Sequence, residues 1–213
     1  MAEKKPLLIV ALGDSTTAGT PYFRSPLEAP PDGEGDPEVP WPAHLEALRP
    51  GWKVANRGVN GQRTDQIAAR LRQDVVAAKP RYAVILAGVN DVYQGVPPET
   101  IRRNLIRMYL ETKAAGIVPV AASVLPFTNA SAEQSRGIRE LNDFIEKTAR
   151  DLGFPFCDTH KAAADPKNPH RLRGSDDGLH PDPPTYKLVA DALAATIDAL
   201  ERKSSKPAKK RPG

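Results

Sequence analysis

The sequence predicts an α/β fold in which helices cover both faces of a parallel sheet. Short β-rich runs alternate with amphipathic helical patterns along the chain, as is typical of this class. The 213 residues, 40% of them apolar, suffice for one core of ordinary size and hardly for two. No internal repeat is visible. We therefore expect one α/β domain.

Five apolar, β-rich runs are the predicted strands. They cover Leu7–Leu12, Lys53–Asn56, Tyr82–Ala87, Val118–Val124 and Phe154–Asp158. Because crossovers between parallel strands are right-handed, five such strands favour the doubly wound order 2-1-3-4-5. The first strand then lies between the second and the third.

Helices are predicted between these strands and after the last one, wherever apolar residues recur at three- or four-residue spacing. In the first helix after the second strand, for example, Ile67, Leu71 and Val75 share one face. Gly116 and Gly153 are suited to end two of the later helices. The predicted helices span about residues 42–48, 64–79, 97–115, 138–152 and 188–200.

The net positive charge of the chain comes from its last residues. Residues 203–213 hold five Lys and Arg and no acid, so subtracting them from the net charge of +4 leaves −1 for the rest. This segment is rich in Lys, Pro and Ser and is expected to be disordered. We therefore divide the chain into a domain at 1–202 and a basic tail at 203–213. Nucleic-acid binding is not expected of the nearly neutral domain.

The chain is expected to be cytoplasmic and to lack a membrane span. No apolar stretch approaches the ~20 residues that cross a bilayer. The apolar run from Pro6 to Leu12 is short for a signal peptide and leads directly into Gly13. The single cysteine, Cys157, fits a reducing compartment. Oligomeric state is left open.

Four polar, glycine-containing segments remain outside the core patterns. They are Gly13–Gly19, Asn56–Gly61, Gly88–Asp91 and Asp177–Pro181. The first three follow the first three strands, and the fourth lies between the fifth strand and the last helix. The predicted strand order brings all four to the carboxyl edge of the sheet, where open α/β sheets bind ligands.

Ser15 is the candidate nucleophile. It lies between Gly13 and Gly19 on a predicted strand-to-helix turn, which can present the hydroxyl to solvent. A serine hydroxyl needs an adjacent base, and His180 is the best candidate. Asp177 precedes it by three residues and can orient the imidazole and stabilise its charged form.

Attack on a carbonyl creates an oxyanion, which requires preorganised hydrogen-bond donors. The candidates are the Ser15 amide, the Gly61 amide and the side-chain amide of Asn90. These residues come from three different segments, which the sheet edge is expected to bring together.

Each segment also has a structural explanation, and other functions stay open. Gly-Asp-Ser is a common turn, Gly61 suits a strand-to-helix connection, and Asn90-Asp91 can cap a helix. An acyltransferase could use the same acyl-enzyme, and a binding module could keep the fold without turnover. A metal-dependent phosphoesterase is a further alternative, with candidate ligands Asp14, Asn90, Asp91, Asp177 and His180.

In their order and content, the four segments resemble the blocks of the SGNH (GDSL-type) serine hydrolase family. The resemblance covers residues 6–202. It implies a flavodoxin-like three-layer α/β/α fold with neither a metal nor an organic cofactor. It also implies that Ser15 is the nucleophile, that Asp177 and His180 complete the triad, and that Gly61 and Asn90 complete the oxyanion hole.

Two positions depart from the family pattern. Thr16 stands where leucine is common, a position that packs rather than reacts. Val89 replaces the glycine often seen before the asparagine, which would narrow the floor of the pocket. Together with Val89, we expect Asp14 and Phe127 to contact the substrate.

A proline-rich insertion at residues 20–40 directly follows the nucleophile segment. Its six prolines prevent a regular helix. We expect it to form a partial lid over the site, with Tyr22 and Phe23 available to contact an acyl or aryl group. A surface elaboration away from the substrate is the alternative.

The predicted reaction is hydrolysis of a small-molecule carboxylic ester through an acyl-enzyme on Ser15. The sequence leaves acetylesterase, lysophospholipase and thioesterase activities open, because loop shape decides substrate choice.

Overall fold

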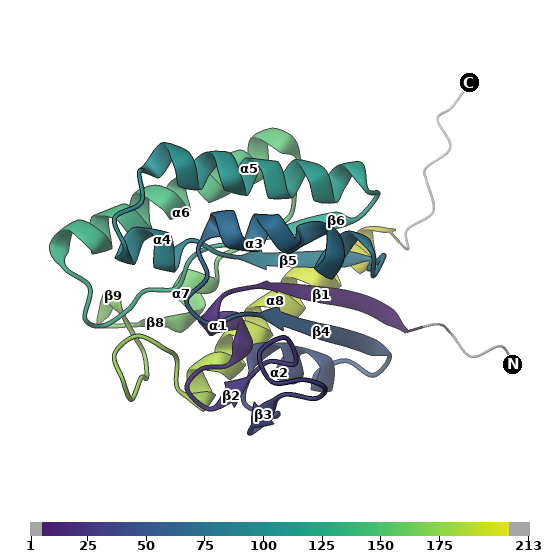
Figure 1. Cartoon of the computed structure of the whole chain (residues 1–213), viewed down its shortest axis with the longest axis horizontal. Coiled ribbons are helices and arrows are strands. Elements are labelled where there is room, and N and C mark those ends of the chain that lie inside the picture. The colour runs from purple at the N-terminus through teal and green to yellow at the C-terminus, as the bar shows by residue number, and fades with distance from the viewer. Residues whose placement is uncertain (1–5, 205–213) are drawn as a thin grey trace, which may run out of the picture.

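The computed structural model describes residues 6–204 and contains a five-stranded parallel sheet (Figure 1). Its strands are β1 (Leu7–Gly13), β4 (Trp52–Gly58), β5 (Tyr82–Leu86), β6 (Val118–Ala122) and β7 (Phe156–Cys157). Their order is β4-β1-β5-β6-β7, and every neighbouring pair is parallel. In order of appearance this is the predicted 2-1-3-4-5, so the predicted topology is confirmed.

The last strand is shorter than predicted and pairs over two residues where five were expected. Pro155 has no N–H to add to the ladder, although its carbonyl accepts the Ala121 amide. On the other side, the Asp158 side chain accepts the Lys161 amide and begins a helix. The strand is therefore confined between a proline and a helix cap.

All five predicted helices are present, with shifted ends. They are α2 (Trp41–Ala47), α3 (Thr64–Leu71), α5 (Pro98–Ala114), α6 (Ala132–Leu152) and α8 (Pro183–Ser204). Helix α3 continues as a π-helical turn, η1 (Arg72–Val76). Helix α6 begins earlier than its apolar pattern because Ser131 and Gln134 form a capping box. Helix α8 extends past the predicted start of the tail at 203, and the rest of that tail lies outside the described residues.

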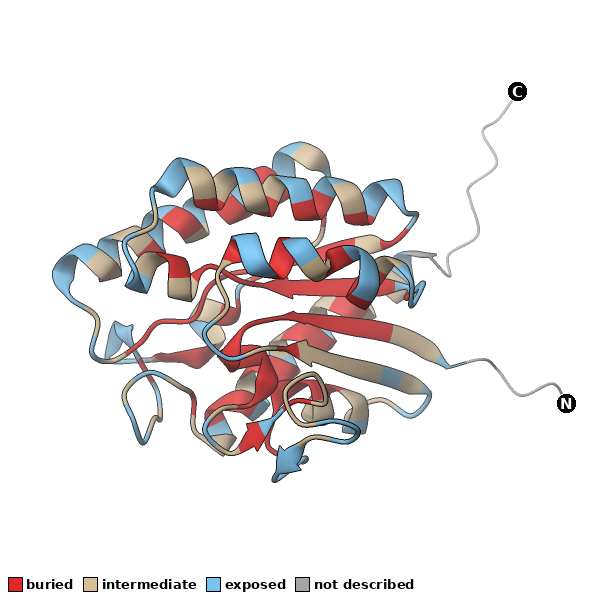
Figure 2. Cartoon of the chain, in the orientation of Figure 1, coloured by how far each residue is buried: buried red, intermediate tan, exposed pale blue. Residues whose placement is uncertain are grey.

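The sheet lies between two layers of helices (Figure 1), and residues where the sheet and helices face one another are largely buried (Figure 2). Successive strand residues point to opposite faces. Val10 and Leu12 of β1 therefore pack in the cluster formed with α3, α5 and α6. Ile9 and Ala11 pack in the cluster formed with α2 and α8. This is the three-layer α/β/α arrangement that the family resemblance implied.

Within the described residues, no helix has the length and apolar character needed to cross a membrane.

Several short elements were not predicted because they are too short to show periodicity. The unpredicted elements are α1 (Ser15–Ala18), α4 (Val89–Tyr93), α7 (Thr159–Ala163), the hairpin of β2 (Phe23–Arg24) and β3 (Glu34–Gly35), and the hairpin of β8 (Ala164–Asp165) and β9 (Asn168–Leu172).

Candidate active site

Ser15, His180 and Asp177 lie in one hydrogen-bonded chain. The distance from His180 Nε2 to Ser15 Oγ is 3.0 Å, and that from His180 Nδ1 to Asp177 Oδ2 is 2.6 Å. A carboxylate only accepts hydrogen bonds, so Nδ1 carries the proton and Nε2 is free to accept from the serine hydroxyl. The sheet edge thus brings together two residues that are 165 positions apart.

Asp177 is held in place by backbone as well as by the imidazole. Its Oδ1 accepts the amides of Leu179 and His180, each at 2.8 Å. Burial raises the pKa of Asp177, but the hydrogen bonds from the His180 ring and from these amides outweigh burial and lower that pKa to about 2. The carboxylate is therefore ionised throughout the neutral range and can stabilise an imidazolium.

The three predicted oxyanion donors border the same cavity. Among the hydrogen bonds within residues 6–204, none is donated by the backbone amide of Ser15 or of Gly61. The side chain of Asn90 donates one amide hydrogen to the Gln62 carbonyl at 3.0 Å. That bond fixes the orientation of the amide and leaves its second hydrogen available to a ligand. The arrangement can supply three donors to one anion.

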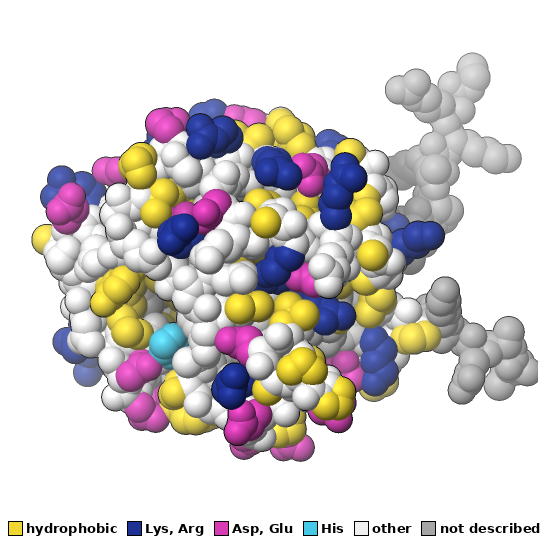
Figure 3. Space-filling model, viewed as in Figure 1, with side chains coloured by type: hydrophobic (Ala, Val, Ile, Leu, Met, Phe, Trp, Pro, Cys, Tyr) yellow, Lys and Arg dark blue, Asp and Glu magenta, His cyan; other side chains and the backbone are white. Residues whose placement is uncertain are grey.

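The cavity next to Ser15 has a volume of about 360 Å³ and a largely apolar wall. Val89 and Phe127 border it, as expected from the sequence. Figure 3 shows a hollow on this face bordered by hydrophobic side chains and a histidine. The complete lining is Ser15, Thr16, Thr20, Asn60, Gly61, Val89, Asn90, Tyr93, Phe127, Leu179 and His180.

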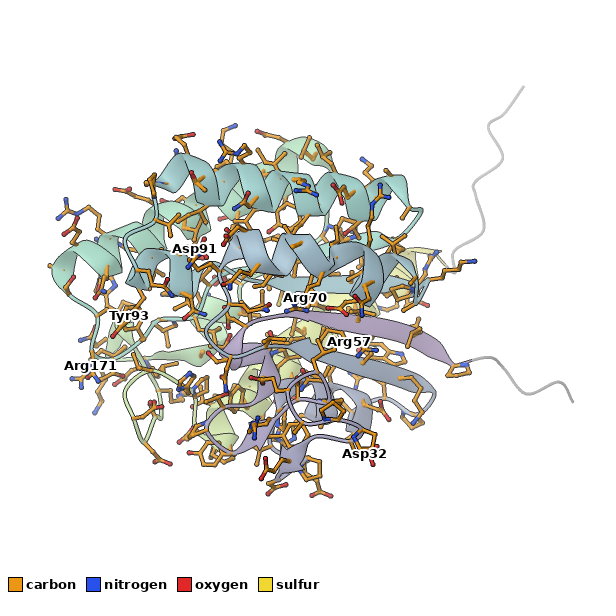
Figure 4. The ribbon with its side chains drawn as sticks, viewed as in Figure 1. Asp32, Arg57, Arg70, Asp91, Tyr93 and Arg171 are labelled. Carbon is orange, nitrogen blue, oxygen red and sulfur yellow. The ribbon has the colours of Figure 1, made fainter. Side chains whose placement is uncertain are left out.

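Sequence reasoning missed two of the apolar wall residues, Tyr93 and Leu179. They are two of the three large hydrophobic residues exposed in the described part of the chain, at 54% and 36%. The ring of Tyr93, which Figure 4 labels, packs edge-on against Phe127, and the two ring centroids are 6.0 Å apart. Tyr93 lies three residues after Asn90, so recognising the short helix α4 would have placed both on one face.

Asp14 does not contact the cavity, which corrects the expectation that it binds substrate. It is 1% exposed, and its Oδ1 accepts both the amide and the hydroxyl of Thr16. Burial raises the pKa of Asp14 to about 6, although the bonds from Thr16 oppose that rise. Asp14 therefore shapes the turn that carries Ser15.

The insertion at residues 20–40 does not cover the cavity, so the expected lid is absent. Only Thr20 borders the catalytic cavity, whereas Phe23 and several prolines form a different cavity of about 570 Å³ with α2 and β4. Phe23 is 6% exposed and is buried within the insertion. The Tyr22 hydroxyl donates to Asp176, which ties the insertion to the loop that carries Asp177. Tyr22 and Phe23 are thus structural contacts.

The residues of the alternative metal site do not converge on one point. Asp14 is bonded to Thr16 and Asp91 to Thr64. Across residues 6–204, no three His, Cys, Asp or Glu side chains are grouped so as to hold a metal ion. The donor arrangement thus does not fit the phosphoesterase alternative.

Comparison with known proteins identifies the family. The profile of the GDSL-like Lipase/Acylhydrolase family matches residues 11–188. The chain belongs to this family. It is therefore an ester hydrolase of the GDSL type, and the match includes every residue of the triad and the oxyanion hole proposed from the sequence.

Individual relatives are distant but nearly full-length. The chain is 27% identical to thioesterase 1/protease 1/lysophospholipase L1 of Escherichia coli (strain K12), covering 90% of this chain and 84% of that protein. It is also 27% identical to an arylesterase of Vibrio mimicus, covering 89% and 87%. A structure assigned to the G-D-S-L lipolytic family, from Desulfitobacterium hafniense DCB-2, superposes with a TM-score of 0.75 at 27% identity, covering 89% and 99%.

Proposed function

We propose that this hydrolase cleaves carboxylic esters through an acyl-enzyme formed on Ser15. The observation that carries the proposal is the continuous chain from Ser15 Oγ to His180 Nε2 and from His180 Nδ1 to Asp177 Oδ2. His180 takes the serine proton as Oγ attacks the carbonyl carbon, and it then donates that proton to the leaving alcohol. Water attacks the acyl-enzyme next, with His180 again as base.

Negative charge develops on the carbonyl oxygen as the tetrahedral intermediate forms. The amides of Ser15 and Gly61 and the free hydrogen of the Asn90 side chain are its proposed donors. These groups are fixed before substrate arrives, so they stabilise the tetrahedral intermediate without reorganising.

We further propose that the preferred substrates have a compact apolar group next to the scissile bond. Val89, Tyr93, Phe127 and Leu179 border a cavity of about 360 Å³ whose wall is largely apolar. Such a wall favours an alkyl or aryl group over a highly polar one. The names of the two relatives above, a thioesterase/lysophospholipase and an arylesterase, agree with an apolar group on the acyl or the alcohol side of the scissile bond.

Labelling and substitution test the nucleophile. A fluorophosphonate should modify the wild-type protein at Ser15, and Ser15→Ala should lose both the label and several orders of magnitude in kcat. Ser135→Ala, which removes a hydroxyl on helix α6, is the matched control and should keep the label and the wild-type kcat. Labelling that persists in Ser15→Ala, with undiminished hydrolysis of p-nitrophenyl esters, would refute the proposal.

A further inference from the structure

Gly61 has no side chain through which neighbouring residues could hold its amide in position. Gly61 is exposed and has a φ of +70°, a left-handed conformation that favours glycine. A Cβ placed on it would have no heavy atom within 4 Å. The direction of the Gly61 amide must therefore be set by the residues that flank it in the connection from β4 to α3.

The next residue, Gln62, is anchored twice. Its side-chain Oε1 accepts a hydrogen bond of 2.7 Å from Nε of Arg70. Its main-chain carbonyl accepts the 3.0 Å bond from the Asn90 amide. Gln62 thus connects the loop of one proposed oxyanion donor, Gly61, to another donor, Asn90.

The same guanidinium also holds the strand that leads to the third donor. Arg70 Nη2 donates to the carbonyl of Gly13 at 2.7 Å, two residues before Ser15, and Nη1 donates to the carbonyl of Arg57 at 2.9 Å. Figure 4 labels Arg70 and Arg57, which lie where α3 passes the sheet. One cation therefore binds the ends of β1 and β4 and the side chain of Gln62.

The guanidinium itself has little freedom. Arg70 Nη1 forms a 2.6 Å ion pair with Asp74, and the two side chains are only 14% and 4% exposed. Bonds from a charged donor in such a shielded place are stronger than neutral ones. With four hydrogen bonds made, Arg70 provides a rigid reference point.

We propose that Gln62, held by Arg70, is a positioning residue for the oxyanion hole. It keeps the Gly61 amide in register with the Ser15 and Asn90 donors. Because catalysis by such donors depends on their being fixed where the charge develops, loosening Gln62 weakens transition-state binding more than substrate binding. This inference rests on the proposed ester hydrolysis.

Gln62→Met tests the inference, because methionine keeps the length of the side chain and removes the acceptor for Arg70. We expect kcat to fall about ten-fold while KM stays within about twofold, the pattern of a lost transition-state interaction. Gln73→Met, the same substitution at an exposed position of η1, is the control and should leave both constants unchanged.

A thionoester substrate separates positioning from general loosening of the fold. Sulfur accepts hydrogen bonds more weakly than oxygen, so an intact oxyanion hole favours an ester over the matching thionoester. In Gln62→Met we expect this preference to shrink by about the same factor as kcat. An unchanged preference, or a defect confined to KM, would overturn the role of Gln62. Absence of ester hydrolysis in the wild type would instead refute the proposed function.

Arg70→Lys provides the second arm of the test. Lysine keeps the charge beside Asp74 but lacks the planar fork that reaches Gly13, Arg57 and Gln62 together. We expect it to reproduce the smaller preference for the ester over the thionoester. The preference is measured once circular dichroism has shown that the variant is folded. If Arg70→Lys does not fold, Gln62→Met alone decides the matter. A folded Arg70→Lys with the wild-type preference would contradict the proposal.

Discussion

At the scale of single residues, Asp14 and Ser15 are neighbours in one turn but have different roles. Ser15 faces the cavity and His180, whereas Asp14 is buried and bonded to Thr16. The sequence pattern marks both equally, since both belong to the same short segment. Only the direction of each side chain separates a reacting group from one that shapes the turn.

Replacing Asp14 tests how its burial makes the free energy of unfolding depend on pH. The folded-state pKa of about 6 lies above the ordinary value of 3.8 for an aspartate, so the folded protein holds this proton more tightly than the unfolded chain. The resulting stability is fully present below pH 3.8 and is lost as pH rises through 6. Asn at position 14 should remove this dependence. We expect urea unfolding to show wild type losing up to about 3 kcal/mol relative to Asp14→Asn between pH 4 and pH 8.

Titrating groups that do not interact with Asp14 are common to both proteins, so they cancel in this difference, whereas His180 and Asp91 interact with its charge. Parallel stability curves for wild type and Asp14→Asn over that pH range would show that Asp14 does not titrate as its burial requires.

Asn90 has a separable role at the same scale. Asn90→Ala removes the proposed side-chain donor, and we expect kcat to fall by about 10²–10³ with little change in KM. Steady-state kinetics on p-nitrophenyl esters measures both constants. Asn168→Ala, an exposed change in β9, should leave them unaltered. An effect limited to KM would make Asn90 a substrate-binding residue instead.

At the scale of elements, helix α4 forms the partition between two cavities. Tyr93 borders the catalytic cavity and also a neighbouring one of about 420 Å³ between α4, α5 and α6. The neighbouring cavity is bordered by Val96, Ile101 and Leu141 among others. A single exposed ring on a five-residue helix thus limits the space available to a substrate.

Removing that ring should change chain-length preference. Tyr93→Ala is expected to join the two cavities and to raise kcat/KM for p-nitrophenyl octanoate relative to acetate by about ten-fold, as extra methylenes find apolar contact. Tyr93→Phe should keep the wild-type ratio. Leu110→Ala, which truncates another exposed hydrophobic residue, controls for loss of surface apolar area. An unchanged ratio in Tyr93→Ala would mean that the second cavity is not reached.

At the scale of the whole molecule, the two apolar layers share one sheet. Leu105 lies in the layer with α5, and Leu193 lies in the layer with α8; both are 0% exposed. A domain of this construction is expected to unfold as one unit, since neither layer has a sheet of its own.

Core truncation tests this coupling. Leu105→Ala and Leu193→Ala should each lower the free energy of unfolding by about 2–5 kcal/mol. Each variant should still show a single transition, coincident by fluorescence and circular dichroism, and a kcat close to wild type in the folded protein. Two separated transitions would show that the layers unfold independently.

The order of the strands, and the edge at which the functional segments meet, follow from local patterns in the sequence. Hydrophobic periodicity is a local property, and right-handed crossovers leave few topologies for five parallel strands. The sequence therefore predicts that one site contains Ser15, Gly61, Asn90 and His180.

Tertiary structure alone decided what surrounds that site. The insertion packs beside β4 and α2, Tyr93 and Leu179 form the cavity wall, and Arg70 joins two strand ends to Gln62. These contacts join segments far apart in the chain, and their geometry depends on loop shape and side-chain direction. Neither leaves a periodic signal in sequence, because each is fixed by packing partners that come together only when the whole chain folds.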